Sequence, residues 1–585
     1  MKNLGKMLLL AGALAASASS HAAELDWVQR SNADAQLLLD VLARYNPESA
    51  ADLGVEGHDT GIFDLKPGFD TRFEADLASV ATQLEGKLAT EKDTHVQQDL
   101  HILIDAAVDN RTTSEMNRRL MLPYFDLPQA LFQGFQSLLD PRVSKDRYPA
   151  ALTRLRKYTG REPGYTPITQ LARERAEERF GVEGLTGPWT VEVEQNLDNE
   201  PRYVSGIRDL FKESGLTGWQ ADLDLLEQQL AEHSRWVRSA ILPRARKTNR
   251  LPPEIYADNL RNFGVDADPR ALIDLAVLSF VETRDEMQTI AGLVAKERGY
   301  ESSDYRDVLR ELKKDKIARD QLLDIYRARL SSIEDIVRRE NLLSLPERAA
   351  VIRLASEAES AAIPAPRLSP PRLIGNTGEP AEFVLPTGNP NAPPGTTMDD
   401  FDFDAITWSL TAHEARPGHE LQFARMIEGG VSIPRAVFAF NSANVEGWAL
   451  YAEAMVKQYL PLEGQVGTLQ MRMMREARAF LDPMLNLGMI EPAAVQEFLI
   501  KEVGLSEPMA KQEVDRYSFK APGQATSYFY GYEKQLSLRG HVELVLGDRF
   551  DARSYHEFVL DQGLLPPDLL KEAVMRQYVP SRLKP

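Results

Sequence analysis

The chain has 585 residues, of which 43% are hydrophobic and 26% charged, and this composition is typical of a folded globular protein rather than of a disordered one. Its formal net charge of −19 at pH 7 repels phosphate backbones and anionic lipid headgroups, so nucleic acids and membranes are disfavoured as partners. The sequence contains no cysteine, which excludes disulfide bonds and cysteine-based catalysis. Any zinc ion must therefore be bound by histidine and carboxylate side chains.

The first 22 residues have the pattern of an export signal. Lys2 and Lys6 precede an apolar stretch of about ten residues, and small residues follow as far as Ala22. This stretch is too short to span a bilayer, so a membrane anchor is not expected. We expect residues 1–22 to be a cleavable signal peptide. Since no lipobox cysteine is present, the mature protein is expected to be periplasmic or secreted.

Residues 23–363 are predicted to form an N-terminal helical region. Their apolar residues recur at intervals of three and four, as in the stripe that contains Leu223, Leu226 and Leu230. Such stripes are expected to pack into a core rather than to carry chemistry. A chain of this length and pattern is expected to fold as a mainly α protein with two lobes.

Residues 364–400 are predicted to connect two helical regions. Nine prolines and four glycines fall between Pro364 and Gly395, a density that no helix tolerates. Within this segment, AEFVLP around Phe383 is the best strand candidate in the chain. Helical patterning then resumes over residues 401–585, and prolines interrupt it at Pro434, Pro461, Pro522 and Pro566.

The segment TAHEARPGHELQ, residues 411–422, indicates a metal site. Zinc hydrolases of the commonest helical type place two histidines four residues apart, with a glutamate beside the first. Here His413 and His419 are six residues apart. On a regular helix this spacing would leave the two side chains about 120° apart. Because Pro417 breaks the hydrogen-bond pattern and Gly418 accepts nearly any backbone angle, the pair is expected to bulge the helix and to bring His419 back toward His413.

A carboxylate from NVEGWALYAEAM, residues 444–455, is the expected third ligand. Glu446 follows His419 by 27 residues, and Glu453, seven residues later, lies on the same helix face. Carboxylates on such an apolar helix are costly unless a cation or hydrogen bonds compensate them. A single residue of this kind is usually solvated surface, but the combination of a His-Glu pair, a nearby histidine and an acidic helix predicts a metal site.

These two segments, together with RYSFKAPGQATSYFYGYEKQLSLR at residues 516–539, resemble the bacterial family DUF885. The family pattern joins a His-Glu-x-x-Pro-Gly-His helix, a Glu-Gly-Trp-Ala helix and a Pro-Gly-Gln segment with a tyrosine and a glycine. The family is grouped with zinc metallopeptidases of the gluzincin kind. The resemblance implies that His413, His419 and Glu446 bind one Zn²⁺ ion and that Glu414 is the general base.

The same resemblance suggests further residues of the site. Tyr528 matches the family tyrosine and would place a phenol near the metal. Candidates for contacts to the metal ligands or to the substrate are Glu453, Gln524, Tyr532 and Arg539, and for Tyr532 and Arg539 core or groove packing is the alternative. The chain departs from the family at one point, because Asn486 follows Asp482 by four residues where relatives often have a histidine.

The resemblance implies a metallopeptidase-like fold, with a small β element before the metal-binding helix, and an exported zinc-dependent hydrolase that acts on peptides. Glu414 would accept a proton from a metal-activated water, and Tyr528 would donate a hydrogen bond to the developing oxyanion. The strand near Phe383 is expected to align an extended substrate along a sheet edge. The alternatives are a metal-dependent amidase that does not cleave peptides and a catalytically inactive exported binding protein. A structural zinc is least expected, because three ligands beside a glutamate form the open arrangement of catalytic sites.

Overall fold

The computed structural model describes residues 26–140, 143–355, 359–360, 363, 365–376, 378–386 and 398–584. The expected signal peptide, residues 1–22, lies outside the described residues. Within them the protein is mainly α, as predicted, with one small three-stranded sheet. None of the helices in the described part combines the length and hydrophobicity that crossing a bilayer requires. The limits of the expected regions, 23–363, 364–400 and 401–585, remain predictions.

The helices before the sheet are the helix at residues 26–45, α2 (Pro47–Leu53), α3 (Phe69–Leu88), α4 (Thr94–Leu120), α5 (Leu127–Leu139), α6 (Pro149–Tyr158), α7 (Ile168–Glu177), α8 (Thr190–Ser214), α9 (Gln220–Trp236), α10 (Pro253–Asn262), α11 (Pro269–Arg298), α12 (Tyr305–Leu312) and α13 (Leu322–Arg339). The helices after it are α15 (Ile406–Glu414), α16 (His419–Gly429), α17 (Ser442–Lys457), α18 (Leu462–Asn486), α19 (Pro492–Lys501), α20 (Glu507–Asp515), α21 (Ser527–Leu546), α22 (Ala552–Asp561), α23 (Pro567–Ala573) and α24 (Val579–Leu583). Short π and 3₁₀ turns are η1 (Val237–Ile241), η2 (Leu242–Arg244), η3 (Pro434–Phe438), η4 (Arg516–Lys520), η5 (Gln524–Thr526), η6 (Gly547–Arg549) and η7 (Val574–Tyr578).

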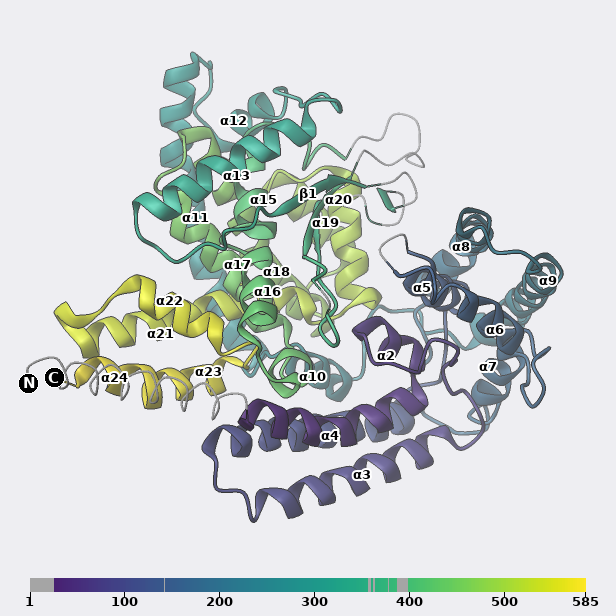
Figure 1. The fold of residues 1–585 in the computed structure, drawn as a ribbon. Coiled ribbons are helices and arrows are strands. Elements are labelled where there is room, and N and C mark those ends of the chain that lie inside the picture. The colour runs from purple at the N-terminus through teal and green to yellow at the C-terminus, as the bar shows by residue number, and fades with distance from the viewer. Residues whose placement is uncertain are drawn as a thin grey trace, which may run out of the picture.

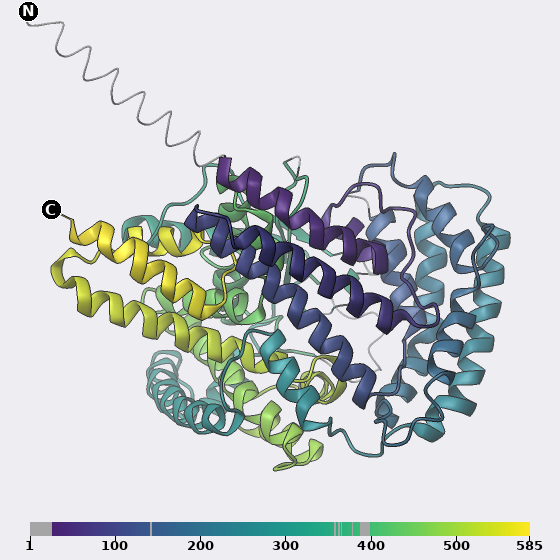
Figure 2. The same cartoon turned by 90° about the horizontal axis from the view of Figure 1, so that it is seen from below.

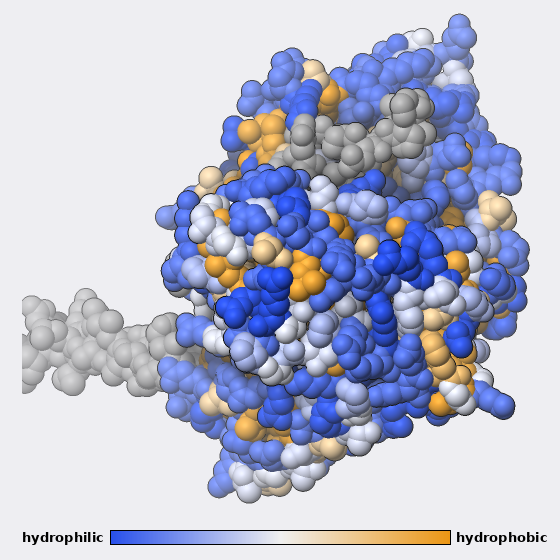
Figure 3. Space-filling model, turned by 90° about the vertical axis from the view of Figure 1, so that its right-hand side faces the viewer, coloured by the Kyte–Doolittle hydropathy of each residue, from blue (hydrophilic) through white to orange (hydrophobic). Residues whose placement is uncertain are grey.

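The helices form two groups. Helices α5 to α9 gather on one side of the molecule, apart from the sheet and the C-terminal helices (Figure 1), and the view from below shows the same separation (Figure 2). The α5 to α9 group has its own core, which includes Phe135 and Phe211. A larger core surrounds α11 and α18 and includes Met473 and Phe480. The face on the side of α5 to α9 is mostly hydrophilic, with apolar residues in small separated groups (Figure 3).

The sheet has the order β1 (Val351–Leu354), β3 (Glu382–Leu385) and β2 (Arg367–Ser369). Strand β3 is the predicted AEFVLP strand, whereas β1 lies within the region that was expected to be helical. Strand β3 is central, because it pairs with β1 in parallel along one edge and with β2 in antiparallel orientation along the other. Phe383 is therefore flanked by Ile352 of β1 and Leu368 of β2. The expectation that the strand near Phe383 offers a free edge is therefore wrong, and β2 is the edge strand beside α15.

Helices α17 and α21 cross at two glycines. A Cβ atom built on Gly531 would lie 1.8 Å from the carbonyl oxygen of Ala443, and one built on Gly447 would lie 2.5 Å from the carbonyl carbon of Gly531. Only glycine allows the two backbones to approach so closely. The crossing fixes the position of Glu446 on α17 relative to Tyr528 on α21, since each side chain is within one turn of its glycine.

We predict that Gly531→Ala lowers the free energy of unfolding by about 2 kcal/mol or more, because the added methyl group meets backbone that cannot move aside. Gly540→Ala is the matched control on the same helix, since no atom lies within 4 Å of the Cβ position at Gly540. The control is expected to be neutral or to stabilise the protein by up to about 1 kcal/mol. Urea titration of both variants tests this, and equal midpoints would show that the close crossing does not constrain the fold.

Candidate metal centre

The two histidines of TAHEARPGHELQ lie on two separate helices. Helix α15 ends at Glu414 and α16 begins at His419, and residues 415–418 form a turn between them. The expected bulge within one helix is therefore wrong, because the helix ends and a new one begins. A Cβ atom on Gly418 would lie 1.9 Å from the carbonyl oxygen of His413, so only glycine fits at this position.

This turn brings the two imidazoles together. Their ring centroids are 4.7 Å apart, and the rings are nearly perpendicular. The carboxylate oxygen Oε2 of Glu446 lies 3.4 Å from Nε2 of His413 and 3.4 Å from Nε2 of His419. Ligand atoms of the three residues all lie within 4.8 Å of one another, so the three side chains could hold one metal ion. The sequence thus predicted the three residues that meet here.

The negative charge of Glu446 is coupled to the two imidazoles beside it. His413 and His419 are only 3% and 6% exposed, and the buried Oε2 atom of Glu446 has no hydrogen-bond partner. Burial raises the pKa of the Glu446 carboxyl, but the two adjacent imidazoles outweigh burial and hold that pKa well below its usual range. Burial lowers the pKa of His413, whereas the carboxylates of Glu446 and Glu453 raise it to about 9. The site thus favours a negative carboxylate with a positive charge beside it.

Glu453 contacts the His413 ring on the nitrogen that does not face Glu446. Its Oε1 atom lies 2.7 Å from Nδ1 of His413, and the Ser409 hydroxyl donates a hydrogen bond to its other oxygen. The guanidinium of Arg475 approaches the same carboxylate at 3.9 Å. Burial raises the pKa of Glu453, but Arg475 and His413 together lower it below its usual value. An ionised Glu453 accepts the Nδ1 proton of His413, so Nε2 is the nitrogen that faces Glu446 and the one that could bind a metal ion when the imidazole is neutral.

Glu414 is held by the edge strand. Its Oε2 atom accepts a hydrogen bond from the backbone N–H of Leu368 in β2 at 2.8 Å. The side chain is partly exposed, in contrast to the buried His413 beside it. The sheet therefore fixes one carboxylate oxygen of Glu414, next in the chain to His413.

Tyr528 and Gln524 reach the same region from α21 and η5. The Tyr528 ring stacks on the His413 ring, with centroids 6.4 Å apart and planes at 14°. The Gln524 carbonyl oxygen accepts a hydrogen bond from Arg516, and its amide donates to the Ser442 hydroxyl at 2.9 Å. The structure therefore brings the expected phenol next to a candidate ligand, while Gln524 ties η5 to the start of α17.

Tyr532 and Arg539 have packing partners further along α21. The Tyr532 hydroxyl accepts a hydrogen bond from Arg472. Arg539 donates to the Tyr451 hydroxyl at 3.0 Å and pairs with Glu543 at 2.6 Å. These contacts favour the packing interpretation of both residues.

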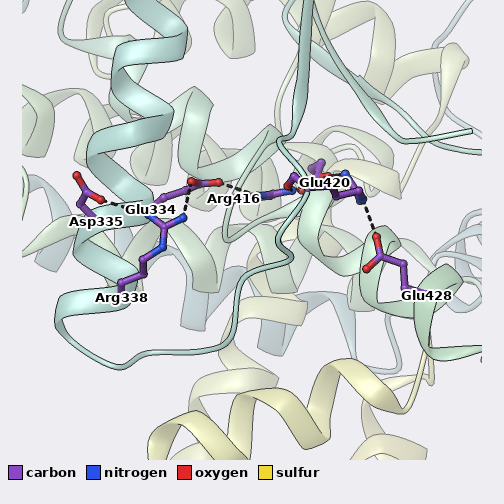
Figure 4. Close-up of polar contacts among 7 residues, drawn as sticks. Glu334, Asp335, Arg338, Arg416, Glu420 and Glu428 are labelled. Carbon is purple, nitrogen blue, oxygen red and sulfur yellow. Dashed lines mark hydrogen bonds and ion pairs between the residues drawn. The ribbon is translucent and has the colours of Figure 1, made fainter.

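Sequence reasoning did not assign a role to Arg416, which anchors the turn between the histidines. This arginine is 1% exposed and pairs with Glu420 at 2.6 Å and with Glu334 of α13 at 2.7 Å. It also donates to the carbonyl oxygen of Arg348, whose side chain pairs with Glu420 at 2.8 Å. Figure 4 shows these contacts as a continuous line from α13 to α16, reaching Glu428. The signal available in the sequence was an arginine between the two histidines with a glutamate four residues later.

Asn486, at the family's histidine position, has a structural role here. Its amide donates to a carboxylate oxygen of Asp482 and to the carbonyl oxygen of Tyr517. Asp482 in turn accepts hydrogen bonds from the backbone N–H of Gly523 and from the Tyr256 hydroxyl. Burial raises the pKa of Asp482 to about 7. The pair thus holds the turn that leads to Gln524, and asparagine is sufficient for it.

Comparison with known proteins identifies relatives of the chain. The model of the family described as "Bacterial protein of unknown function (DUF885)" matches residues 47–574. No curated protein matches the chain. Two solved structures share its fold. One is a "putative lipoprotein of unknown function" from Shewanella oneidensis, with a TM-score of 0.74 and 18% identity over 94% of this chain and 100% of that chain. The other is a "putative lipoprotein" from Colwellia psychrerythraea, with a TM-score of 0.76 and 18% identity over 94% of this chain and 99% of that chain. Because the family model spans most of the sequence, the protein belongs to the DUF885 family.

Proposed function

We propose that this protein is an exported zinc-dependent hydrolase, a metallopeptidase of the gluzincin kind that cleaves peptide bonds. The observation that carries the proposal is the meeting of His413, His419 and Glu446, whose ligand atoms lie within 4.8 Å of one another. Two imidazoles and one carboxylate are a ligand set that zinc takes in catalytic sites.

The residues fit a zinc ion in two further respects. The Glu446 oxygen between the two imidazoles is buried without a hydrogen-bond partner, and a cation would compensate it. Glu453 holds His413 in the tautomer that a ligand requires, by the carboxylate-to-histidine contact common at zinc sites. Among the described residues three protein ligands meet here rather than four, which favours a catalytic over a structural site.

Bound zinc would supply a Lewis acid that lowers the pKa of water to about 7 and polarises a carbonyl oxygen. Glu414 would accept the proton from the attacking water with the oxygen that Leu368 does not occupy and would pass it to the leaving amine. Tyr528 would donate its hydroxyl proton in a hydrogen bond to the oxyanion. Strand β2, an edge strand tied to Glu414, is the part of the sheet where an extended peptide could lie beside the site.

We predict that His413→Ala, His419→Ala and Glu446→Ala each lose bound zinc, because each removes one of three ligands. Glu414→Gln is expected to keep zinc and to lose at least about 100-fold in turnover, the usual contribution of a general base. The measurements are zinc content by mass spectrometry and hydrolysis of a mixed peptide library with and without chelator. His541→Ala, an exposed histidine on α21, is the control and should retain both properties.

Two results would contradict this proposal. Native turnover by Glu414→Gln would remove the general-base assignment. A wild-type protein that binds no zinc would remove the metal site altogether. Hydrolysis of other amides in place of peptides would assign the same residues to a metal-dependent amidase.

We further predict that Glu453→Gln weakens zinc binding by about 10- to 100-fold, as loss of the carboxylate behind a metal-bound histidine generally does. Glu543→Gln is the matched control, since Glu543 pairs only at the protein surface with Arg539. Competition with a chromogenic chelator measures both affinities. Equal affinities for the two variants would show that Glu453 does not orient His413.

A further inference from the structure

Four arginines converge on Tyr528 and Tyr532 of α21, beside the candidate site. Arg472, Arg475 and Arg478 come from α18 and Arg516 comes from η4. The guanidinium carbons of Arg475, Arg478 and Arg516 lie 5.9, 4.7 and 5.5 Å from the centre of the Tyr528 ring. This concentration of positive charge contrasts with the net charge of −19 of the whole chain.

Arg516 differs from Arg478 in how its charge is balanced. Arg478 forms two hydrogen bonds of 2.7 Å with Glu513 and is buried. Arg516 approaches the same, already occupied carboxylate only at 3.7 Å. Its hydrogen bonds go instead to neutral oxygens, those of Gln524 and of the Tyr528 hydroxyl, the latter at 3.2 Å.

Arg516 is also the arginine of this group that solvent reaches beside Tyr528. Its side chain is 26% exposed, compared with 5% for Arg475 and 5% for Arg478. A partly exposed arginine whose nearest carboxylate is 3.7 Å away can bind a planar anion, and a carboxylate matches the geometry of its paired N–H donors.

The location of Arg516 limits which part of a substrate it can touch. Under the proposed function the Tyr528 hydroxyl faces the carbonyl of the bond that is cleaved, and Arg516 donates to that hydroxyl. An extended peptide advances about 3.5 Å per residue. A carboxylate on Arg516 therefore belongs to the first or second residue beyond the cleaved bond.

We propose that Arg516 binds the free C-terminal carboxylate of a peptide substrate, so that the enzyme is a carboxypeptidase that releases one or two residues. This inference rests on the proposed hydrolytic function. The reaction remains simple hydrolysis, in which water gives a hydroxyl to the carbonyl carbon and a proton to the departing amine. An acidic side chain near the cleaved bond offers the same carboxylate chemistry, and the test below separates the two sources.

The test compares three peptides. The first has a free C-terminus, the second is the same sequence with a C-terminal amide, and the third is an amidated variant whose last residue is aspartate. Binding is measured by calorimetry on the full-length zinc-loaded Glu414→Gln protein, and hydrolysis on the zinc-loaded wild type. We expect the free acid to bind at least about 10-fold more tightly than either amide, given the strength of charged hydrogen bonds. In the Glu414→Gln background, Arg516→Gln should abolish this difference.

The matched control is Lys520→Gln, which removes one exposed positive charge four residues along η4. It should leave the preference for the free acid unchanged. In an otherwise wild-type protein, Arg516→Gln should raise KM for the free acid by about 10- to 100-fold and leave the amide unaffected.

Three results would overturn the assignment. Equal binding of the free acid and the simple amide would exclude a site for the C-terminal carboxylate. Tighter binding of the aspartyl amide than of the free acid would show that Arg516 binds an acidic side chain instead. A loss of kcat with Arg516→Gln on acid and amide alike would show that Arg516 only positions Tyr528. In each case the zinc content and hydrolysis of the wild type would still stand, so failure of this inference is distinct from failure of the proposed function.

Discussion

The Glu446 carboxylate between two imidazoles is the constraint on which the rest of the site depends. A carboxylate in buried surroundings must be balanced, and the oxygen of Glu446 that faces His413 and His419 has no other partner. The site requires backbones to approach more closely than a Cβ atom permits. Gly418 allows this at the turn that brings the two histidines together, and Gly447 allows it where α17 crosses α21, which positions Glu446 relative to Tyr528. The glycines of the sequence pattern are therefore as essential to the geometry as the ligands.

The ligands are supported from two sides by buried ion pairs. On one side, Arg475 and Ser409 hold Glu453, which orients His413. On the other, Arg416 ties the turn after His413 to α13 and α16. Removing one partner of a buried ion pair leaves an unbalanced charge at a cost of about 3 to 5 kcal/mol, so neither support can relax easily. These contacts therefore fix the elements that carry the three candidate ligands relative to one another.

The sequence predicted local chemistry better than long-range contacts. The seven-residue spacing from Glu446 to Glu453 placed both on one helix face, and the composition around Phe383 predicted a strand, because both depend on local periodicity. Pro417 and Gly418 indicated an interruption of the helix, but propensity does not distinguish a bulge in one helix from two separate helices, because that depends on the close approach of Gly418 to the His413 carbonyl. Strand β1 has only four residues, too few for a pattern, and its partner lies 31 residues further along the chain. Arg416 belongs to the same class, because its partners come from α13 and α16.

The electrostatics of the molecule differ between long and short range. A net charge of −19 repels anionic peptides at a distance, but at about 0.1 M salt this field decays over about 10 Å. Within that distance of Tyr528 three guanidinium groups lie less than 6 Å from its ring, and among these three Arg516 has the most exposed side chain. Long-range steering therefore does not favour an anionic substrate, and any preference must arise from contacts after it has entered. Such a site would discriminate by where the carboxylate sits relative to the cleaved bond and not by the overall charge of the peptide.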